Sequence, residues 1–246
     1  MAGGLLMNDT LKLNGNKPKM IAHRGMSGIE LENTCSAFVA AGNRSYFGIE
    51  TDVHRTADGQ FIIIHDDNTK RVAGDEMIVE KTCYETLRAI RLVDKDGAKG
   101  RKDLLMPSLR EYIRICKKYE KIAVLELKNH FRPADIDSII AIIREEEYLE
   151  NTIFISFDLP NMICIRERLP EQKAQFLISE YTDWLLETLQ KEKLDLDIKY
   201  VALTKERVDA LHAAGIEVNC WTVDTLEDAQ RMTEYGVDYI TSNIVE

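Results

Sequence analysis

The chain has 246 residues, 45% of them hydrophobic and 30% charged, with a formal net charge of −10 at pH 7. This length and composition are typical of a globular protein with a substantial core. The negative charge disfavours a nucleic-acid partner, because a phosphate backbone would be repelled, and no apolar run approaches membrane-spanning length, so stable membrane insertion is not expected. The five cysteines are odd in number and form no CxxC pair, which predicts a reducing, cytoplasmic location.

The first part of the chain begins with an irregular segment and continues into strands. Residues 1–18 lack the basic stretch and apolar core of a signal peptide, so we expect a flexible leader. A strand is predicted from residue 19, a helix over 34–41 and a strand over 47–53. The apolar run 60–65 follows too closely for a parallel crossover, so it must return as a hairpin. A two-residue Asp58-Gly59 loop would place Asp52 opposite His65, on the same face.

A long, charged and Gly-punctuated segment then interrupts the pattern at about residues 66–106. It contains one short helical pattern, over 84–90. Segments of this length without regular structure are uncommon inside a compact domain, so we interpret it as an insertion. Ser108 then begins a helix with a capping box, because Glu111 follows three residues later.

From residue 121 the chain alternates strands and helices, the rhythm of parallel βα units. Without the return strand of the hairpin, strands start near residues 19, 47, 121, 152, 174, 199, 217 and 237. Eight parallel strands close a barrel, so we predict an α/β fold of the (β/α)8 TIM-barrel class. A single domain would span 19–246, with the small insertion after the second barrel strand and its hairpin. An open doubly wound sheet is disfavoured because no Gly-rich phosphate loop follows a strand.

Acidic residues stand where predicted barrel strands end, which is where barrel active sites lie. Glu50 and Asp52 are two residues apart on a strand, so their side chains share a face. Neighbouring carboxylates repel each other unless a cation lies between them. Glu126, on the next barrel strand, can supply a third carboxylate, and three hard oxygen ligands favour Mg²⁺ or Ca²⁺. Solvated carboxylates on a barrel rim are the alternative interpretation.

Two histidines accompany these acids. His23 ends the first strand, and the hairpin delivers His65, so their imidazoles are predicted to form an acid–base pair. Arg24 and Lys128 are suited to binding phosphate oxygens, although a salt bridge from Arg24 to a carboxylate such as Glu32 is a rival interpretation.

The other histidines are predicted to have no role. His54 shares the face of Asp52 but is expected to be an exposed bystander. His130 and His212 are expected in a loop and on a helix surface.

In these residues the sequence resembles the glycerophosphodiester phosphodiesterase family, over about residues 19–243. The shared motifs are His23-Arg24-Gly25, Glu32-Asn33-Thr34, Glu50-x-Asp52, His65-Asp66, Glu126-x-Lys128, Ser156-Phe157-Asp158, Trp221-Thr222-Val223 and the segment 236–241. Each motif alone is weak, whereas all of them in order are specific. Two departures are Leu31, where the family usually has Pro, and the segment 241–244, which lacks the usual Pro.

The resemblance implies a barrel with an insertion after the His-Asp motif. The roles that it implies are catalytic for His23 and His65, binding of Mg²⁺ or Ca²⁺ for Glu50, Asp52 and Glu126, and substrate binding for Arg24, Lys128 and Trp221, with Trp221 packed against the glycerol part.

The expected activity is metal-dependent hydrolysis of a small-molecule glycerophosphodiester to sn-glycerol 3-phosphate and an alcohol. The attacking group is water or a neighbouring glycerol hydroxyl; both stay open, as do the head group, the ion and the oligomeric state. A lipid-directed enzyme of the phospholipase C or D kind is one rival, although the mixed charges of the insertion offer no membrane-docking cluster. A barrel that only binds phosphoesters is another, although every expected catalytic residue type is present. In a scaffold protein, inward-facing charges would be costly.

Overall fold

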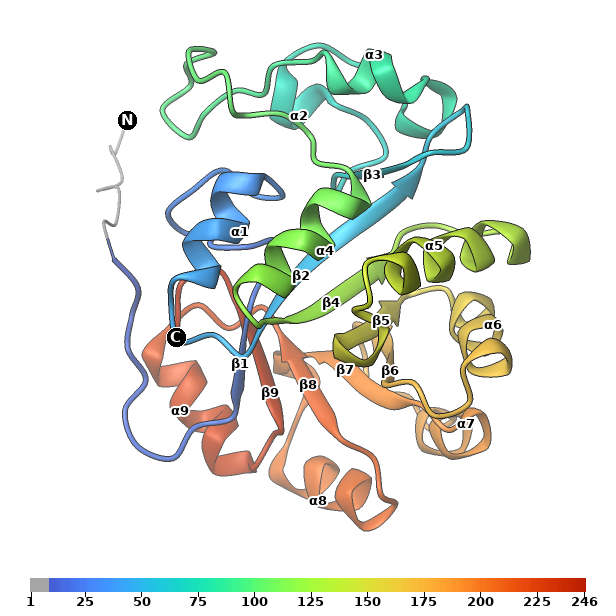
Figure 1. The fold of residues 1–246 in the computed structure, drawn as a ribbon. Helices are drawn as coiled ribbons and strands as arrows, with labels where there is room; N and C mark the ends of the chain where they lie inside the picture. Colours follow the sequence, from blue (N-terminus) through green and yellow to red (C-terminus); the bar gives the residue numbers. More distant parts are fainter. Residues whose placement is uncertain (1–8) are drawn as a thin grey trace.

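The computed structural model describes residues 9–246 and consists of a barrel of parallel strands surrounded by helices (Figure 1). Eight strands pair around the barrel in the order β1, β9, β8, β7, β6, β5, β4 and β2, and the pairing of β1 with β2 closes it. The short strand β3 pairs antiparallel with β2 outside the barrel. The predicted TIM-barrel class is confirmed, and the closed pairing excludes an open sheet.

The strands are short and mostly buried. They are β1 (Lys19–Ala22), β2 (Gly48–Arg55), β3 (Phe61–Ile63), β4 (Ile122–Leu127), β5 (Thr152–Ser156), β6 (Ala174–Ile178), β7 (Asp195–Lys199), β8 (Val218–Trp221) and β9 (Tyr239–Ser242). The helices around the barrel are α1 (Cys35–Gly42), α4 (Leu109–Lys118), α5 (Pro133–Glu145), α6 (Leu159–Arg168), α7 (Leu185–Glu192), α8 (Lys205–Ala213) and α9 (Leu226–Tyr235).

Local sequence signals set several of these helix boundaries. The Ser108 hydroxyl accepts from the Glu111 backbone N–H at 3.1 Å, and the Glu111 carboxylate accepts from the Ser108 N–H at 2.7 Å, so the predicted capping box is confirmed. The Thr225 hydroxyl caps α9 by accepting from the Asp228 N–H at 3.1 Å. That helix ends at Gly236, whose φ of 85° lies in the left-handed region that favours glycine.

One strand differs from the sequence prediction. We expected the sixth barrel strand to start near residue 199. The strand is instead β7 (Asp195–Lys199), and Tyr200–Ala202 forms a 3₁₀ helix. The cause is the polar lining of the barrel at this point. Leu196 and Ile198 belong to the core outside the barrel, whereas the alternate positions are aspartates, so no apolar run marks the strand.

The predicted register of the hairpin is wrong by one residue. The loop has three residues, 57–59, with Gly59 at a φ of 82°, and β2 pairs Arg55 with Phe61 and Val53 with Ile63. The Thr56 hydroxyl stabilises this longer loop by accepting from the Gln60 N–H at 3.0 Å. Three-residue hairpin loops commonly end in a left-handed glycine. His65 therefore lies one residue beyond the position opposite Asp52.

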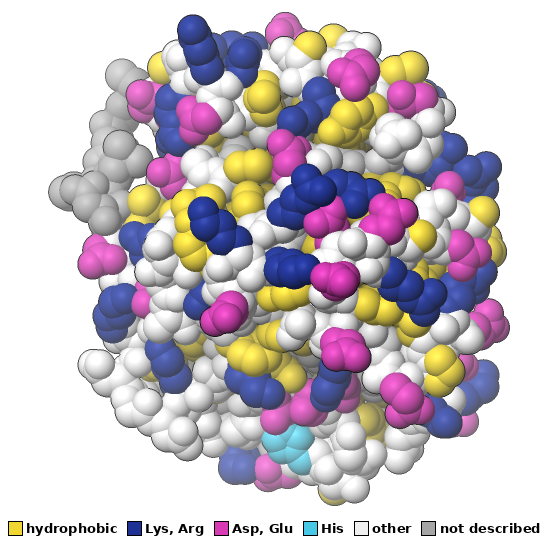
Figure 2. All heavy atoms as spheres, in the orientation of Figure 1, with side chains coloured by type: hydrophobic (Ala, Val, Ile, Leu, Met, Phe, Trp, Pro, Cys, Tyr) yellow, Lys and Arg dark blue, Asp and Glu magenta, His cyan; other side chains and the backbone are white. Residues whose placement is uncertain are grey.

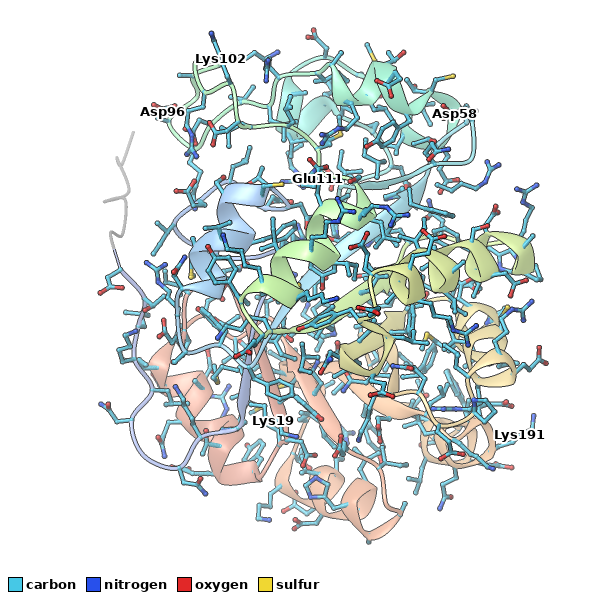
Figure 3. All side chains as sticks on the ribbon, in the orientation of Figure 1. Lys19, Asp58, Asp96, Lys102, Glu111 and Lys191 are labelled. Carbon is cyan, nitrogen blue, oxygen red and sulfur yellow. The ribbon has the colours of Figure 1, made fainter. Side chains whose placement is uncertain are left out.

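Residues 66–106, the predicted insertion, lie beyond the arrowhead of β2 and contain α2 (Lys70–Ala73), the 3₁₀ helix Val79–Lys81 and α3 (Tyr84–Arg88) (Figure 1). The segment has a small core of its own, which includes Val72, Leu87 and Leu104. Its Arg88 forms an ion pair of 3.0 Å with Glu111, which lies where α4 meets the insertion (Figure 3). The insertion is thus packed onto the barrel end that carries the strand C-termini.

Part of the segment predicted as a flexible leader pairs with the other end of the chain. The Leu11 N–H donates to the Ile244 carbonyl at 3.0 Å, and the Leu13 N–H donates to the Glu246 carbonyl at 2.8 Å. The Glu246 carboxylate accepts from the Thr10 hydroxyl at 2.7 Å and lies 2.6 Å from Lys12 Nζ. Residues 1–8 of the predicted leader lie outside the described residues.

Within residues 9–246, no helix is both long and apolar enough to cross a bilayer. On the face shown in Figure 2, acidic and basic side chains are intermixed rather than gathered into one large patch of a single sign.

Tyr112 joins helix α4 to the barrel strands through its hydroxyl, and this interaction can be tested by mutation. It is fully buried in α4, and its one hydroxyl hydrogen is shared between the carbonyl oxygens of Ile49 at 2.7 Å and Val124 at 3.2 Å. Tyr112→Phe is expected to lower the free energy of unfolding by about 1–2 kcal/mol in a denaturant titration, because these bonds are lost inside the core. Tyr119→Phe, at the half-buried C-cap position of the same helix, is the control, with an expected change within about 0.5 kcal/mol. Equal effects of the two changes would contradict the assignment.

Candidate active site

Three carboxylates meet inside the barrel, at the C-terminal parts of β2 and β4. Glu50 and Asp52 lie two residues apart on β2, and Asp52 is in register with Glu126 on β4. One ligand oxygen of each side chain lies within 4.8 Å of the other two, and all three residues are buried. This geometry agrees with the prediction from the sequence that the three carboxylates lie close together, on one face of the strands.

Two cationic side chains partly balance the acids. Lys128 Nζ lies 2.8 Å from the Glu126 carboxylate and 3.6 Å from that of Asp52. Arg24 Nε lies 3.6 Å from Asp52, and its Nη1 forms an ion pair of 2.9 Å with Glu32. Arg24 therefore forms the salt bridge to Glu32 that the rival interpretation expected. The same side chain also lines the cavity described below.

The three carboxyl groups have different affinities for a proton. Burial raises the pKa of Glu50 well above its usual value, and the charges of Asp52 and Glu126 raise it further. Burial also raises the pKa of Glu126, together with the charge of Asp52. For Asp52 the effect of burial is outweighed by Lys128 and Arg24, which hold its pKa well below the usual range. One ionised acid thus lies between two acids that resist ionisation.

His23 is oriented by an amide. Its Nδ1 lies 2.7 Å from Asn243 Oδ1, and the Asn243 amide nitrogen donates to Asp224 at 2.6 Å, so the amide presents its oxygen to the ring. Nδ1 therefore carries the hydrogen, and Nε2 is left with its lone pair, 4.0 Å from the Glu50 carboxylate. Burial, with the nearby charge of Arg24, lowers the pKa of His23 to about 4.

His65 is oriented by a carboxylate from the insertion. Its Nδ1 lies 2.7 Å from Asp66 Oδ1, which leaves Nε2 free. Arg71 of α2 donates to Asp66 at 2.7 Å and to Glu32 at 2.8 Å, and its hydrogen bond is the main cause that lowers the pKa of Asp66 to about 2. Burial lowers the pKa of His65, although Asp66 acts in the opposite direction. Arg71 thereby connects the insertion to the loop after β1 at the site.

Both histidines open into one cavity of about 150 Å³. It is lined by His23, Arg24, Glu50, His65, Glu126, Ile155, Phe157, Leu177, Asp197, Trp221 and Thr241. Trp221 packs edge-on against Phe157, with ring centroids 5.6 Å apart and an interplanar angle of 84°. Lys128 lines an adjoining hollow that also includes Glu126 and Phe157. The eight residues singled out from the sequence are thus brought to one end of the barrel.

His54 is not the exposed bystander that we predicted. It is fully buried, with Nε2 3.3 Å from the His65 carbonyl and Nδ1 3.4 Å from Glu80 of the insertion. The prediction was wrong because it did not take into account that the insertion covers this part of β2. His54 supports the backbone that carries His65.

Two other histidines lie away from the cavity lining. His130 is exposed, 3.2 Å from Asp158, and His212 on α8 pairs with Asp238 at 2.9 Å, near the start of β9.

Sequence reasoning gave no role to several residues that orient the site. Asn33 donates to the Asp52 carboxylate at 2.8 Å, Asp66 holds His65, and Asn243 holds His23. Asn33 and Asp66 belong to motifs that the sequence shares with the family, so the sequence alone could have indicated a role for both residues. Asn243 lies in the segment without the usual Pro, and only the fold brings it beside His23.

The acidic cluster has the chemistry of a site for a hard divalent cation. Its donors are three carboxylates from rigid strands, as Mg²⁺ and Ca²⁺ prefer. Within the described residues, Asp52 Oδ1 is buried yet has no hydrogen-bond partner, so it is available as a ligand. The residues present therefore fit such an ion.

Comparisons with known proteins agree with this arrangement. The family model described as "Glycerophosphoryl diester phosphodiesterase family" matches residues 23–246. The chain is 30% identical to a glycerophosphodiester phosphodiesterase of Caldanaerobacter subterraneus, over 92% of this chain and 94% of the relative, and 28% identical to one of Bacillus altitudinis, over 90% and 93%. A solved structure of an Oleispira antarctica phosphodiesterase in complex with the product sn-glycerol-3-phosphate has a TM-score of 0.85 at 25% identity, covering 92% of this chain and 93% of that one. The chain belongs to the glycerophosphoryl diester phosphodiesterase family, an enzyme family, as its motifs indicated.

Proposed function

We propose that this protein hydrolyses glycerophosphodiesters to sn-glycerol 3-phosphate and an alcohol, with the help of a divalent cation and two histidines. The observation that carries the proposal is the convergence of His23 and His65 with Glu50 and Glu126 on one cavity. Membership of the family and the product bound in the Oleispira relative support the substrate class.

The cluster of acids would serve the phosphate end of the substrate. Held by Glu50, Asp52 and Glu126, Mg²⁺ or Ca²⁺ would supply positive charge to the phosphoryl oxygens. Arg24 and Lys128 lie at the same place and can donate to the non-bridging oxygens, which stabilises the charge that builds up in the transition state. Trp221 offers a flat apolar surface to the carbon chain of the substrate.

The histidines would move the protons. Each ring has its Nδ1 hydrogen fixed by a neighbour, Asn243 for His23 and Asp66 for His65, so each presents Nε2 to the cavity. One imidazole accepts the proton of the attacking hydroxyl, and the other, in its protonated form, donates to the oxygen of the leaving alcohol. The orienting partners keep both rings in the productive tautomer.

The activity is tested by incubating the purified protein with glycerophosphocholine and a panel of other head groups, and by identifying the products by phosphorus NMR. Formation of sn-glycerol 3-phosphate is the expected result. Formation of a phosphorylated head group instead would assign cleavage to the other ester bond, and hydrolysis of intact phospholipid alone would favour the lipid-directed alternative. No turnover of any diester would favour a binding-only barrel.

The cellular location proposed for this reaction is the cytoplasm. The support is the absence of any disulfide among the five cysteines, all of which lie in the described residues and are free.

Metal binding is expected to depend on pH. Without a cation, the raised pKa values of Glu50 and Glu126 stabilise the folded state at acid pH, and this contribution is lost as the pH rises through those values. A cation binds the ionised carboxylates, so added Mg²⁺ or Ca²⁺ is expected to raise Tm more at pH 8 than at pH 5. Thermal unfolding with EDTA or with the ion measures this shift. A shift that is larger at pH 5, or that is unchanged in Glu50→Gln, would contradict the site.

A further inference from the structure

Asp197 is a buried acid that the proposed reaction does not use. It lies on β7, and three strands separate β7 from β2 in each direction around the barrel, so Asp197 faces the acidic cluster from the opposite wall. Its exposed fraction is 2%, and it lines the same cavity as His23, His65 and Glu126. A carboxyl group at this place can reach a ligand that extends away from the phosphate end.

The polar side chains near Asp197 form hydrogen bonds with one another and not with Asp197. Asn219 is its partner in register on β8, yet the Asn219 amide donates to Gln175 at 3.1 Å and accepts from Thr241 at 3.2 Å. Within residues 9–246, Asp197 Oδ1 has no hydrogen-bond partner. A buried polar atom without a partner costs free energy, so its presence in a cavity indicates that a ligand supplies the partner.

A second polar atom on the same wall is also unsatisfied. The indole Nε1 of Trp221, on the neighbouring strand β8, is buried and has no partner among the described residues. One wall of the cavity therefore offers a carboxyl group and an N–H donor together. Burial, and then the charge of Glu126, raises the pKa of Asp197 well above its usual value, so a protonated carboxyl that both donates and accepts is favoured.

This combination suits an alcohol and not an anion. A hydroxyl accepts from an N–H while it donates to a carboxyl oxygen, whereas a phosphate finds its cationic partners, Arg24 and Lys128, on the opposite side. With the phosphate at those cations, the glycerol chain can extend across the cavity toward β7.

We propose that Asp197 is a specificity-determining residue that binds, together with the Trp221 indole, the glycerol hydroxyl farthest from the phosphate. The inference rests on the proposed glycerophosphodiester activity and adds the feature by which the site distinguishes glycerol from other alcohols. A site built to hydrogen-bond a hydroxyl discriminates strongly against the analogue that lacks it, because its own polar groups then stay unpaired.

The test compares glycerophosphocholine with the matching diester of propane-1,2-diol, which lacks that hydroxyl. The wild type is expected to prefer the glycerol substrate about 10- to 100-fold in kcat/KM. Asp197→Leu is expected to reduce this preference to about one, whereas Asp197→Asn retains part of it, because an amide also donates and accepts. Equal losses on both substrates in Asp197→Leu would show a merely structural role and overturn the proposal.

Asp195→Asn is the matched control. Asp195 is the same residue type on the same strand, but it accepts from the Glu217 N–H at 2.9 Å and does not line the cavity, so the preference is expected to stay. If Asp197→Leu instead changes the ratio between choline and ethanolamine head groups while the hydroxyl preference stays, Asp197 contacts the leaving alcohol, and the proposal is wrong.

A binding measurement separates this inference from the proposed activity. Calorimetry with sn-glycerol 3-phosphate and with propane-1,2-diol 1-phosphate is expected to show the same preference in the wild type, and its loss in Asp197→Leu. If the wild type hydrolyses no diester but keeps this preference, the proposed activity fails and the assignment of Asp197 stands. If it hydrolyses glycerophosphocholine but binds both monoesters equally, the assignment of Asp197 fails alone.

Discussion

Replacing either His23 or His65 with alanine is expected to lower kcat about 10²- to 10⁴-fold, because each variant lacks one partner in proton transfer. KM should change much less, since the phosphate contacts of Arg24 and Lys128 stay in place. Both side chains line the cavity, so the fold should survive, which circular dichroism and thermal unfolding would check. Steady-state kinetics over a range of pH is the measurement, and each variant is expected to lose a different limb of the bell-shaped profile.

His212→Ala is the control for this pair. His212 lies on α8 and pairs with Asp238, outside the cavity lining, so kcat should stay at the wild-type value. If His23→Ala and His65→Ala turned over substrate as fast as His212→Ala, acid–base catalysis by these residues would be refuted.

Glu126→Gln is expected to lower kcat/KM by about 100-fold or more, because the change keeps the shape of the side chain and removes the charge that a cation needs. The affinity for Mg²⁺ or Ca²⁺, measured by calorimetry, should fall in parallel. Without metal, the variant should unfold at the same temperature as the wild type or higher. The reason is that Glu126 is buried beside two other acids, and its removal relieves their repulsion.

A purely structural role for Glu126 predicts the opposite result. Its carboxylate lies 2.8 Å from Lys128, and loss of a structural ion pair would leave that lysine without its main partner and lower Tm. A lower Tm together with unchanged activity and unchanged metal affinity would therefore move Glu126 out of the metal site.

The sequence was sufficient to predict the barrel and the acidic cluster because both depend on local rules. Alternation of strand and helix determines the parallel architecture, and the spacing of two residues places Glu50 and Asp52 on one face. The N-cap threonines and Ser108 set helix starts for the same local reason. Because these features depend on residues that are neighbours in the chain, an error in the prediction of another segment does not change them.

Features that depend on distant segments could not be predicted in the same way. The hairpin register changed by one residue because the Thr56 hydroxyl stabilises a three-residue loop. His54 was expected at the surface, but the insertion buries it, and Asn243 meets His23 only because β9 lies beside β1. β7 was displaced in the prediction because its inward positions, Asp195 and Asp197, are polar. Inward-facing polar residues thus obscured the strand that carries them.

We propose that three acids and two imidazoles form one metal-assisted phosphodiesterase site. The most direct measurement is the release of sn-glycerol 3-phosphate from glycerophosphocholine before chelation, after EDTA, and after Mg²⁺ or Ca²⁺ is restored, in the wild type and in Asp52→Asn. Chelation should abolish release, the ion should restore it in the wild type, and Asp52→Asn should not respond. Full activity in EDTA, or an equal response of Asp52→Asn, would contradict the claim.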